Sequence, residues 1–397
     1  MTYLRLNDAQ RQAITFEGPG PLLVLAGPGS GKTFVITQRI RYLTEVKKIS
    51  PEKILVLTFT RDAAAAMKER FLRFSTNTVN FGTFHSIFYQ VLKQSTHFND
   101  SQLLTDMDKK GILLPVLGRL LPSALTYERN NLALEIISAI GYYKNSSKKE
   151  EATRRLSPEI KELFDELFTT YETERRKQGK LDFDDMLTDC RRLLSENLEL
   201  RRFWQNKFDY LLIDEFQDVN PAQYEVIRLL TKEPYPIFAV GDDDQSIYGF
   251  RGADPSCMQR FQREYQADVV TLSVNYRSNS KIVNASMKLI KNNQNRFEKE
   301  LVSSKEQLGE QTGDQNGNQE IELRKGIHLK ESRWKENGSI IKRGFRTKEE
   351  ELEYLKETCK SFLLQNDERE GGKDCTKEDE NVSSLAILFR TNRLMQR

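Results

Sequence analysis

The stretch LLVLAGPGSGKT, residues 22–33, joins a short apolar run to a turn of small residues that ends in GKT. This order predicts a strand, a phosphate-binding loop and a helix. The glycines would let the backbone turn tightly and approach a ligand closely. Main-chain N–H groups would then face phosphate oxygens at the positive end of the helix. We expect Lys32 to contact the β- and γ-phosphates of a nucleotide and Thr33 to bind Mg²⁺.

One position departs from the pattern G-x-x-x-x-G-K-[ST], because Ala26 stands where the first glycine is usual. An ordinary glycine-rich turn between a strand and a helix is the alternative explanation. The intact GSGKT after an apolar run favours nucleotide binding over that alternative. The candidate nucleotide-binding residues in this loop are Ala26, Gly27, Pro28, Gly29, Ser30, Gly31, Lys32 and Thr33.

A second pattern, YLLIDEFQD at residues 210–218, is an apolar strand that ends in adjacent carboxylates. Asp214, at the strand end, would hold Mg²⁺ directly or through water. Glu215 would orient and deprotonate the water that attacks the γ-phosphate. An acid-rich loop start is the alternative for any Asp-Glu pair. It does not explain why the pair ends an apolar strand in a chain that also carries a phosphate loop.

Strand and helix patterns alternate up to about residue 95, which predicts a parallel sheet with crossover helices. The expected strands are residues 22–25, 54–57 and 79–81, and the expected helices are residues 33–43, 61–73 and 84–92. Residues 96–180 are charged and helical in pattern, as in an inserted helical subdomain. Strand patterns resume at residues 210–213, 237–240 and 269–272, so we expect both flanking parts to share one sheet.

Composition excludes several classes of protein. The chain has 397 residues and a formal net charge of +3, so any DNA site must be a local basic patch. Its cysteines and histidines are scattered, which argues against a structural zinc or a disulfide framework. There is no signal-peptide pattern and no apolar run of the about 18–20 residues that would span a bilayer. We therefore expect a cytoplasmic protein without membrane contact.

Short sequences follow one another in a distinctive order: LNDAQ, AGPGSGKT, LTFT, GTFHS, DEFQD, GDDDQSIYGFRGA and NYRS. The set resembles the UvrD/Rep-type superfamily 1 DNA helicases from Leu6 to about Asn284, with a weaker match at residues 386–392. The resemblance implies an α/β fold with a P-loop, RecA-like parallel sheet. It implies a first motor domain from residues 1–95 and 183–275, an inserted helical subdomain from residues 96–182, and a partial second motor domain from residues 276–397.

The resemblance also implies roles around ATP and Mg²⁺. Gln10 would read the adenine edge, and Tyr276 would stack on the adenine. Gln245 would sense the γ-phosphate and link it to DNA. Arg277 would act as an arginine finger from the second motor domain. Lys32, Glu215, Gln245 and Arg277 are thus the candidate catalytic residues.

Further matched positions would line single-stranded DNA, where aromatic rings stack on bases without regard to sequence. They are Phe59, Thr83, His85, Tyr248, Phe250 and Arg251. Core packing is the alternative explanation for the aromatic residues. Two positions depart from the family pattern: Phe250 stands where tryptophan is frequent, and Phe34 stands where arginine is often found.

The implied function is that of an ATP-dependent 3′–5′ single-stranded DNA translocase and helicase of repair or replication, with single-stranded and tailed duplex DNA as partners. One alternative is the helicase subunit of a recombination helicase–nuclease, although no carboxylate–lysine cluster of a nuclease is evident. The other is a non-catalytic nucleotide- or DNA-binding module. Lys32 and Glu215 count against it, because a binding module has no need of a general base.

The end of the sequence leads to a further expectation. The family's C-terminal motifs are not evident before Arg397, and residues 385–389 would be a strand of an unfinished sheet. We therefore expect an incomplete second RecA-like domain. The polypeptide alone would bind nucleotide weakly, hydrolyse it slowly and not unwind duplex DNA. A separate chain is one source of the missing half.

Overall fold

The computed structural model describes residues 6–18, 20–73, 75, 78–95, 102–122, 126–146, 148–304, 350 and 353–358. The chain divides into two units, Met1–Ser332 and Arg333–Arg397, and each is described by itself. In the second unit residues 353–358 are helical. The strand expected at residues 385–389 lies outside the described residues. No helix in the described part of the chain is both long and apolar enough to cross a membrane.

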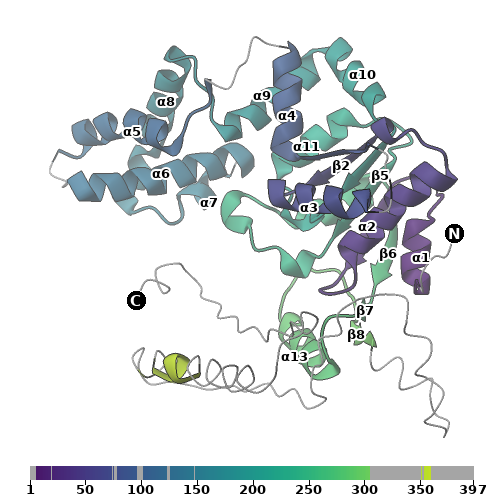
Figure 1. The fold of residues 1–397 in the computed structure, drawn as a ribbon. Coiled ribbons are helices and arrows are strands. Elements are labelled where there is room, and N and C mark those ends of the chain that lie inside the picture. Colours follow the sequence, from purple (N-terminus) through teal and green to yellow (C-terminus); the bar gives the residue numbers. More distant parts are fainter. Residues whose placement is uncertain are drawn as a thin grey trace, which may run out of the picture. The chain divides into compact units, whose positions relative to one another are not determined.

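The first unit is built around a six-stranded sheet in which every neighbouring pair of strands is parallel (Figure 1). The strand order is β3-β2-β4-β5-β1-β6. The strands are β1 (Leu22–Ala26), β2 (Ile54–Thr58), β3 (Asn80–Thr83), β4 (Tyr210–Ile213), β5 (Ile237–Gly241) and β6 (Asp268–Leu272). Strands from both sides of the helical insertion pair with one another. The predicted α/β fold and the shared parallel sheet are therefore confirmed.

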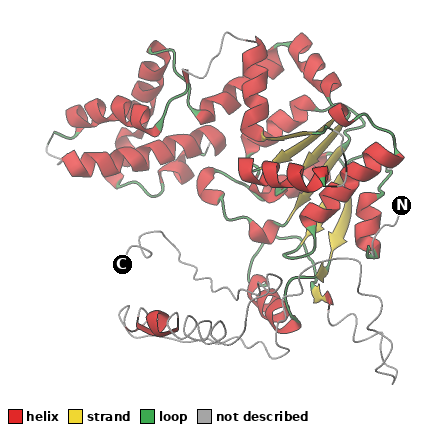
Figure 2. Cartoon of the chain, viewed as in Figure 1, coloured by secondary structure: helices red, strands yellow, loops and turns green. Residues whose placement is uncertain are grey.

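Helices cover both faces of this sheet, as Figure 2 shows around the strands. Alternate residues of a strand point to opposite faces, so Leu23 joins one core cluster and Leu22 the other. The first face packs against α4 (Phe84–Ser95), α9 (Phe183–Glu196), α10 (Leu198–Lys207), α11 (Pro221–Leu230) and α12 (Ser256–Glu264). The second face packs against α1 (Asp8–Ile14), α2 (Lys32–Arg41) and α3 (Arg61–Leu72). Burial on both faces explains why the strands are continuous apolar runs.

The segment between α4 and α9 is mainly helical where it is described, as the sequence predicts. It contains α5 (Asp106–Leu120), α6 (Thr126–Ser146), α7 (Lys149–Thr153) and α8 (Pro158–Lys177). These helices lie together beside the sheet in Figure 1. They bury a core of their own around Leu113, Phe164 and Leu167.

After β6, the described chain forms a second sheet of two short strands. It contains β7 (Val274–Asn275), α13 (Ser280–Ile290) and β8 (Val302–Ser303), and β7 pairs with β8 in parallel. Element bounds elsewhere lie close to those expected. Two helical segments extend three residues beyond the expected end: α4 ends at Ser95, and α2 continues into a π-helical turn, Tyr42–Val46. The second departs from regular α-helix geometry. There the Thr44 hydroxyl donates to the Ile40 carbonyl, a local bond that favours irregular helix geometry.

A buried ionic cluster joins the helical insertion to the sheet. The Lys144 ammonium, on α6, lies 2.6 Å from Glu172 on α8, 2.9 Å from Asp182 and 2.7 Å from Asp185. Asp182 also caps α9, because its carboxylate accepts the Asp185 N–H at 2.7 Å. One cation therefore holds α6 and α8 against the start of α9.

We expect Lys144→Ala to lower the free energy of unfolding by about 3–5 kcal/mol, since it removes the ammonium that pairs with the buried Asp182 carboxylate. Urea denaturation of the variant and the parent chain measures the change. Lys148→Ala is the matched control, because the Lys148 side chain is 50% exposed; its effect should stay within about 0.5 kcal/mol. Equal denaturation midpoints for the Lys144 variant and the parent chain would contradict this role.

Candidate functional site

The predicted site residues gather at the carboxyl ends of the parallel strands. In a parallel sheet these ends share one edge, where α/β proteins bind their ligands. The phosphate loop follows β1, Phe59 follows β2, Thr83 ends β3, Asp214 follows β4, Asp242 follows β5, and Tyr276 and Arg277 follow β6 and β7. Segments far apart in the sequence thus meet at one edge.

The loop between β1 and α2 has the features of an anion site. Gly29 and Gly31 adopt positive φ angles of 68° and 91°, which glycine accepts without strain. No side chain caps the start of α2, and its first turn contains no acidic residue. The first N–H groups of a helix have no partners within it, and they carry partial positive charge. This end of α2 is therefore suited to a phosphate.

The NYRS segment docks directly on the phosphate loop. The Tyr276 N–H donates to the Gly29 carbonyl at 2.9 Å, and the Asn275 side chain donates to the Pro28 carbonyl at 2.8 Å. A Cβ built on Gly29 would lie 2.6 Å from the Arg277 Cβ, so only glycine fits. Asn275 had no predicted role, although its place at the start of NYRS was an available signal.

The N-terminal segment closes the other side of the loop. Gln10 is only 5% exposed, and its amide donates to the Ser30 carbonyl at 3.2 Å. The Asn7 amide donates to the Tyr276 hydroxyl at 2.9 Å. The Tyr276 side chain is nevertheless 50% exposed. The residues expected around an adenine therefore lie together, next to the phosphate loop.

The acidic residues after β4 face the loop. The Lys32 ammonium lies 3.5 Å from the Glu215 carboxylate. Burial first, and the charge of Glu215 second, raise the pKa of the Asp214 carboxyl to about 7 and that of the Asp218 carboxyl likewise. One oxygen of Asp218 is buried without a hydrogen-bond partner. Mg²⁺ prefers such carboxylate oxygens, so this donor set fits a divalent cation, with Thr33 in the first turn of α2.

A side chain without a predicted role, Gln217, links the two acidic loops. Its amide nitrogen donates to Glu215 at 2.9 Å, and its oxygen accepts the Asp242 N–H at 2.9 Å. The Gln245 amide in turn donates to the Asp242 carboxylate. Glu215 and Gln245 are thus connected through Gln217 and Asp242. The available signal was the position of Gln217 inside DEFQD, two residues after Glu215.

Four of the predicted DNA-contacting residues form one cluster. The Phe59 and Tyr248 ring centroids lie 4.7 Å apart, and those of Tyr248 and Phe250 lie 6.0 Å apart. The Arg251 guanidinium lies 5.6 Å from the Tyr248 ring and 5.5 Å from the Phe250 ring. Phe250 is 51% exposed. This aromatic–arginine cluster offers stacking surface and positive charge from two loops, the one after β2 and the one after β5.

The described hydrogen bonds and ring contacts of Thr83 and His85 are with other residues than those of the cluster. The Thr83 hydroxyl accepts the Ser86 N–H at 3.2 Å, which stabilises the start of α4. The His85 ring packs edge-on against Phe88 and Phe183. Burial lowers the pKa of His85, so its imidazole is neutral at physiological pH.

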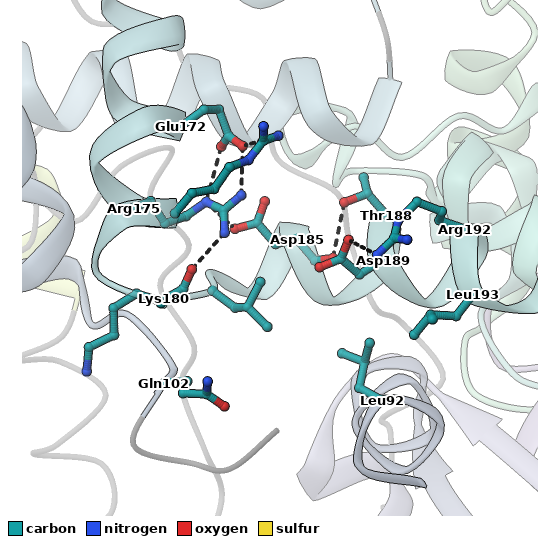
Figure 3. Close-up of a pocket in the computed structure, with 13 residues that line it drawn as sticks. Leu92, Gln102, Glu172, Arg175, Lys180, Asp185, Thr188, Asp189, Arg192 and Leu193 are labelled. Atoms are coloured by element: carbon teal, nitrogen blue, oxygen red, sulfur yellow. Dashed lines mark hydrogen bonds and ion pairs between the residues drawn. The ribbon is translucent and has the colours of Figure 1, made fainter. Parts of the chain in front are cut away.

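A separate cavity of about 620 Å³ lies near the ionic cluster of α8 and α9 (Figure 3). None of the predicted site residues lines it. Several of its charged groups pair with one another: Arg175 contacts Glu172 at 2.7 Å and Asp185 at 2.9 Å. The cavity is therefore distinct from the strand-end site.

Comparison with known proteins extends the similarity along the chain. The UvrD/REP helicase N-terminal domain matches residues 6–266, and the UvrD-like helicase C-terminal domain matches residues 270–397. The prediction that the C-terminal motifs are absent is therefore wrong. It depended on the lack of recognisable short motifs before Arg397, whereas the domain match extends over residues 270–397. The match does not test the expectations of weak nucleotide binding, slow hydrolysis, no unwinding and a separate completing chain, which stay predictions.

Three curated relatives are 35% to 37% identical to the chain over about three quarters of its length. The chain is 37% identical to the protein YjcD of Bacillus subtilis (strain 168) over 76% of its length, covering 40% of that protein. It is 35% identical to the ATP-dependent DNA helicase PcrA of Staphylococcus aureus (strain Mu50) over 75% of its length, covering 41% of the relative. It is 37% identical to the ATP-dependent DNA helicase Rep of Escherichia coli (strain K12) over 76% of its length, covering 45% of the relative.

The chain thus spans less than half the length of these curated relatives. The N-terminal domain match alone covers most of the chain, and it contains the phosphate loop, the acidic strand end and the aromatic–arginine cluster. The chain belongs to the UvrD/Rep helicase family.

Proposed function

We propose that this chain forms the ATP-hydrolysing motor of a DNA helicase that moves along single-stranded DNA. The observation that carries the proposal is the meeting of Lys32 and Glu215, 3.5 Å apart, at the strand edge that also holds the aromatic–arginine cluster. The 3′–5′ polarity, the role in repair or replication, tailed duplex DNA as a partner and the cytoplasmic location stay predictions from the sequence.

The proposal includes a division of labour along the chain. Residues 1–95 and 183–275 would form the first motor domain, residues 96–182 a helical subdomain, and residues 276–397 part of a second motor domain. Contacts support this division, because helices α5, α6 and α8 have a core separate from the two that cover the sheet.

At the nucleotide, ATP with Mg²⁺ would supply the phosphoryl group that is transferred to water. The N–H groups of the loop 26–31 and the Lys32 ammonium would bind the phosphates. Thr33 and Asp214 would hold the metal, and Glu215 would take the proton of the attacking water. Gln245 and Arg277 would stabilise charge on the γ-phosphate. Gln10 and Tyr276 would bind the adenine.

At the DNA, the aromatic–arginine cluster of Phe59, Tyr248, Phe250 and Arg251 would stack on bases and contact the backbone. Thr83 and His85 would contribute through the start of α4. Tyr248, Phe250 and Arg251 of the cluster lie in the same loop as Asp242 and Gln245, so the two ligands would act on one segment. A loop that contacts both ligands would let ATP hydrolysis and movement along the DNA strand influence each other.

The direct test is the rate of ATP hydrolysis with and without single-stranded DNA. We expect DNA to raise the turnover rate, because Gln245, Tyr248 and Phe250 lie in one short segment. Hydrolysis that DNA leaves unchanged would contradict a motor. ATP binding without any hydrolysis would instead favour a non-catalytic binding module.

Two substitutions separate binding from chemistry. Lys32→Ala should weaken ATP binding, since it removes a phosphate contact, whereas Glu215→Gln should leave binding nearly intact and abolish hydrolysis. Equilibrium titration with a fluorescent ATP analogue and steady-state turnover measure the two effects. An equal loss of nucleotide affinity in both variants would contradict the assignment of Glu215 as the base.

Phe250→Ala should weaken single-stranded DNA binding by about 1–3 kcal/mol, independent of base sequence, because one stacking ring is lost. Fluorescence anisotropy at fixed salt measures the affinity. Phe203→Ala is the matched control, since Phe203 is 50% exposed on α10 and lies outside the cluster. Equal affinities for the Phe250 variant and the parent chain would show that no base stacks there.

A further inference from the structure

Lys299 lies between α13 and β8, outside all the short sequences that resemble the helicase family, yet it is among the most completely buried cations described. Its side chain is 1% exposed. The ammonium lies 2.7 Å from Asp242 and 2.8 Å from Asp244, and it also contacts Asp243. A lysine is almost never buried so completely unless it is paired. Here one ammonium group forms ion pairs with three carboxylates.

The residues around Lys299 reinforce the same contact. Arg296 binds Asp244 through two hydrogen bonds of 2.8 and 2.6 Å. The Phe297 N–H donates to Asp243 at 2.7 Å. The segment 296–299 is therefore docked on the loop that follows β5. We call this contact the lysine latch, formed by Lys299 and Arg296 with Asp242, Asp243 and Asp244.

The lysine latch offsets the repulsion among the three carboxylates of the acidic loop. Carboxylate oxygens of Asp242, Asp243 and Asp244 lie within 4.8 Å of one another. Like charges at this separation repel, and burial makes the repulsion stronger. Without the ammonium, the loop would have to open, take up protons or bind another cation.

Asp242 connects the latch to the proposed catalytic groups. It is fully buried, its carboxylate accepts the Gln245 amide, and its N–H donates to Gln217. Gln217 in turn donates to Glu215 at 2.9 Å. A continuous chain of polar contacts therefore runs from Lys299 through Asp242 to the carboxylate that would activate water.

We propose that Lys299 is a positioning residue for nucleotide hydrolysis. Its ammonium neutralises the acidic loop and holds Asp242 where Asp242 can orient Gln245 and Gln217, and through Gln217 the carboxylate of Glu215. The inference rests on the proposed ATP hydrolysis. Lys299 touches neither the phosphate loop nor the aromatic–arginine cluster in any described contact, so its loss should affect turnover more than nucleotide affinity.

The test compares Lys299→Ala with the parent chain in steady-state ATP hydrolysis, with saturating single-stranded DNA. We expect the variant to lose roughly tenfold or more in kcat, while the Kd for an ATP analogue changes by less than about threefold. Ethylammonium in the buffer should restore part of the lost kcat, because it can replace the missing ammonium, and should leave the parent rate unchanged. Lys281→Ala, an exposed lysine on α13, is the matched control.

A second variant tests the charge argument directly. Adding Asp243→Asn to Lys299→Ala removes one repelling charge but keeps an oxygen that can accept the Phe297 N–H. We expect the double variant to be more active than Lys299→Ala alone. Asp243 is the suitable partner, because Asp242 holds Gln245 and Asp244 holds Arg296.

Thermal melting by circular dichroism accompanies both variants. A folded Lys299→Ala chain with the parent kcat would overturn the proposal. So would a loss of turnover that neither ethylammonium nor Asp243→Asn relieves, since that pattern indicates a purely structural ion pair. If the parent chain itself hydrolyses no ATP, the proposed function fails and this inference fails with it. Normal parent activity with an unaffected Lys299 variant refutes the inference alone.

Discussion

The parallel pairing of β1 with β5 and β6 is the constraint on which the rest of the site depends. It places the carboxyl end of β1 beside the ends of strands that come more than two hundred residues later. The phosphate loop can then contact the NYRS segment through Gly29 and Tyr276. The segment packs so closely on the loop that a Cβ at Gly29 would meet the side chains of Arg277 and Asn275, and the φ angle of Gly29 is also positive. Sheet topology and local stereochemistry thus require the same residue.

Two acidic loops at this edge are neutralised to different extents. Around Asp214 and Asp218, Lys32 is the positive charge that opposes the effects of burial and Glu215, and the pKa of each carboxyl is still raised to about 7. Around Asp242, Asp243 and Asp244, the lysine latch supplies buried positive charge from Lys299 and Arg296, which holds the pKa of Asp244 below its usual value. The loop of Asp214 and Asp218 can therefore bind a cation, whereas the loop of Asp242, Asp243 and Asp244 is neutralised by side chains of the protein itself.

Polar side chains also connect the helical insertion to the sheet. The Asn145 amide, on α6, donates to Asp184 at the start of α9, and its oxygen accepts from Asn220 at 3.1 Å. A Cβ on Gly252, next to Arg251, would lie 3.1 Å from the Asn145 Cβ. Together with the ionic cluster of Lys144, these contacts place the aromatic–arginine cluster within reach of the insertion. Movement of the helical insertion would therefore displace the aromatic–arginine cluster, and the reverse.

The sequence by itself determined the sheet and the identity of most candidate site residues. The strand at residues 210–213 is observed with the expected bounds, because strands buried on both faces are continuous apolar runs with polar ends. The phosphate loop and the acidic strand end could be predicted from the sequence, because the chemistry of each depends on residues that are neighbours in the chain. The extent of the C-terminal similarity was not readable from short patterns.

Only the tertiary structure decided how these parts are connected. Gln217 and Asn275 lay inside recognised patterns, but their partners Asp242 and Pro28 are remote in sequence. Lys299 had no signal at all, since a lysine in a charged stretch is ordinarily solvated. Its contact with Asp243 spans 56 residues and depends on how α13 and β8 return to the sheet edge. Periodicity and turn stereochemistry are local properties of a chain, whereas the pairing of buried charges depends on the closed fold.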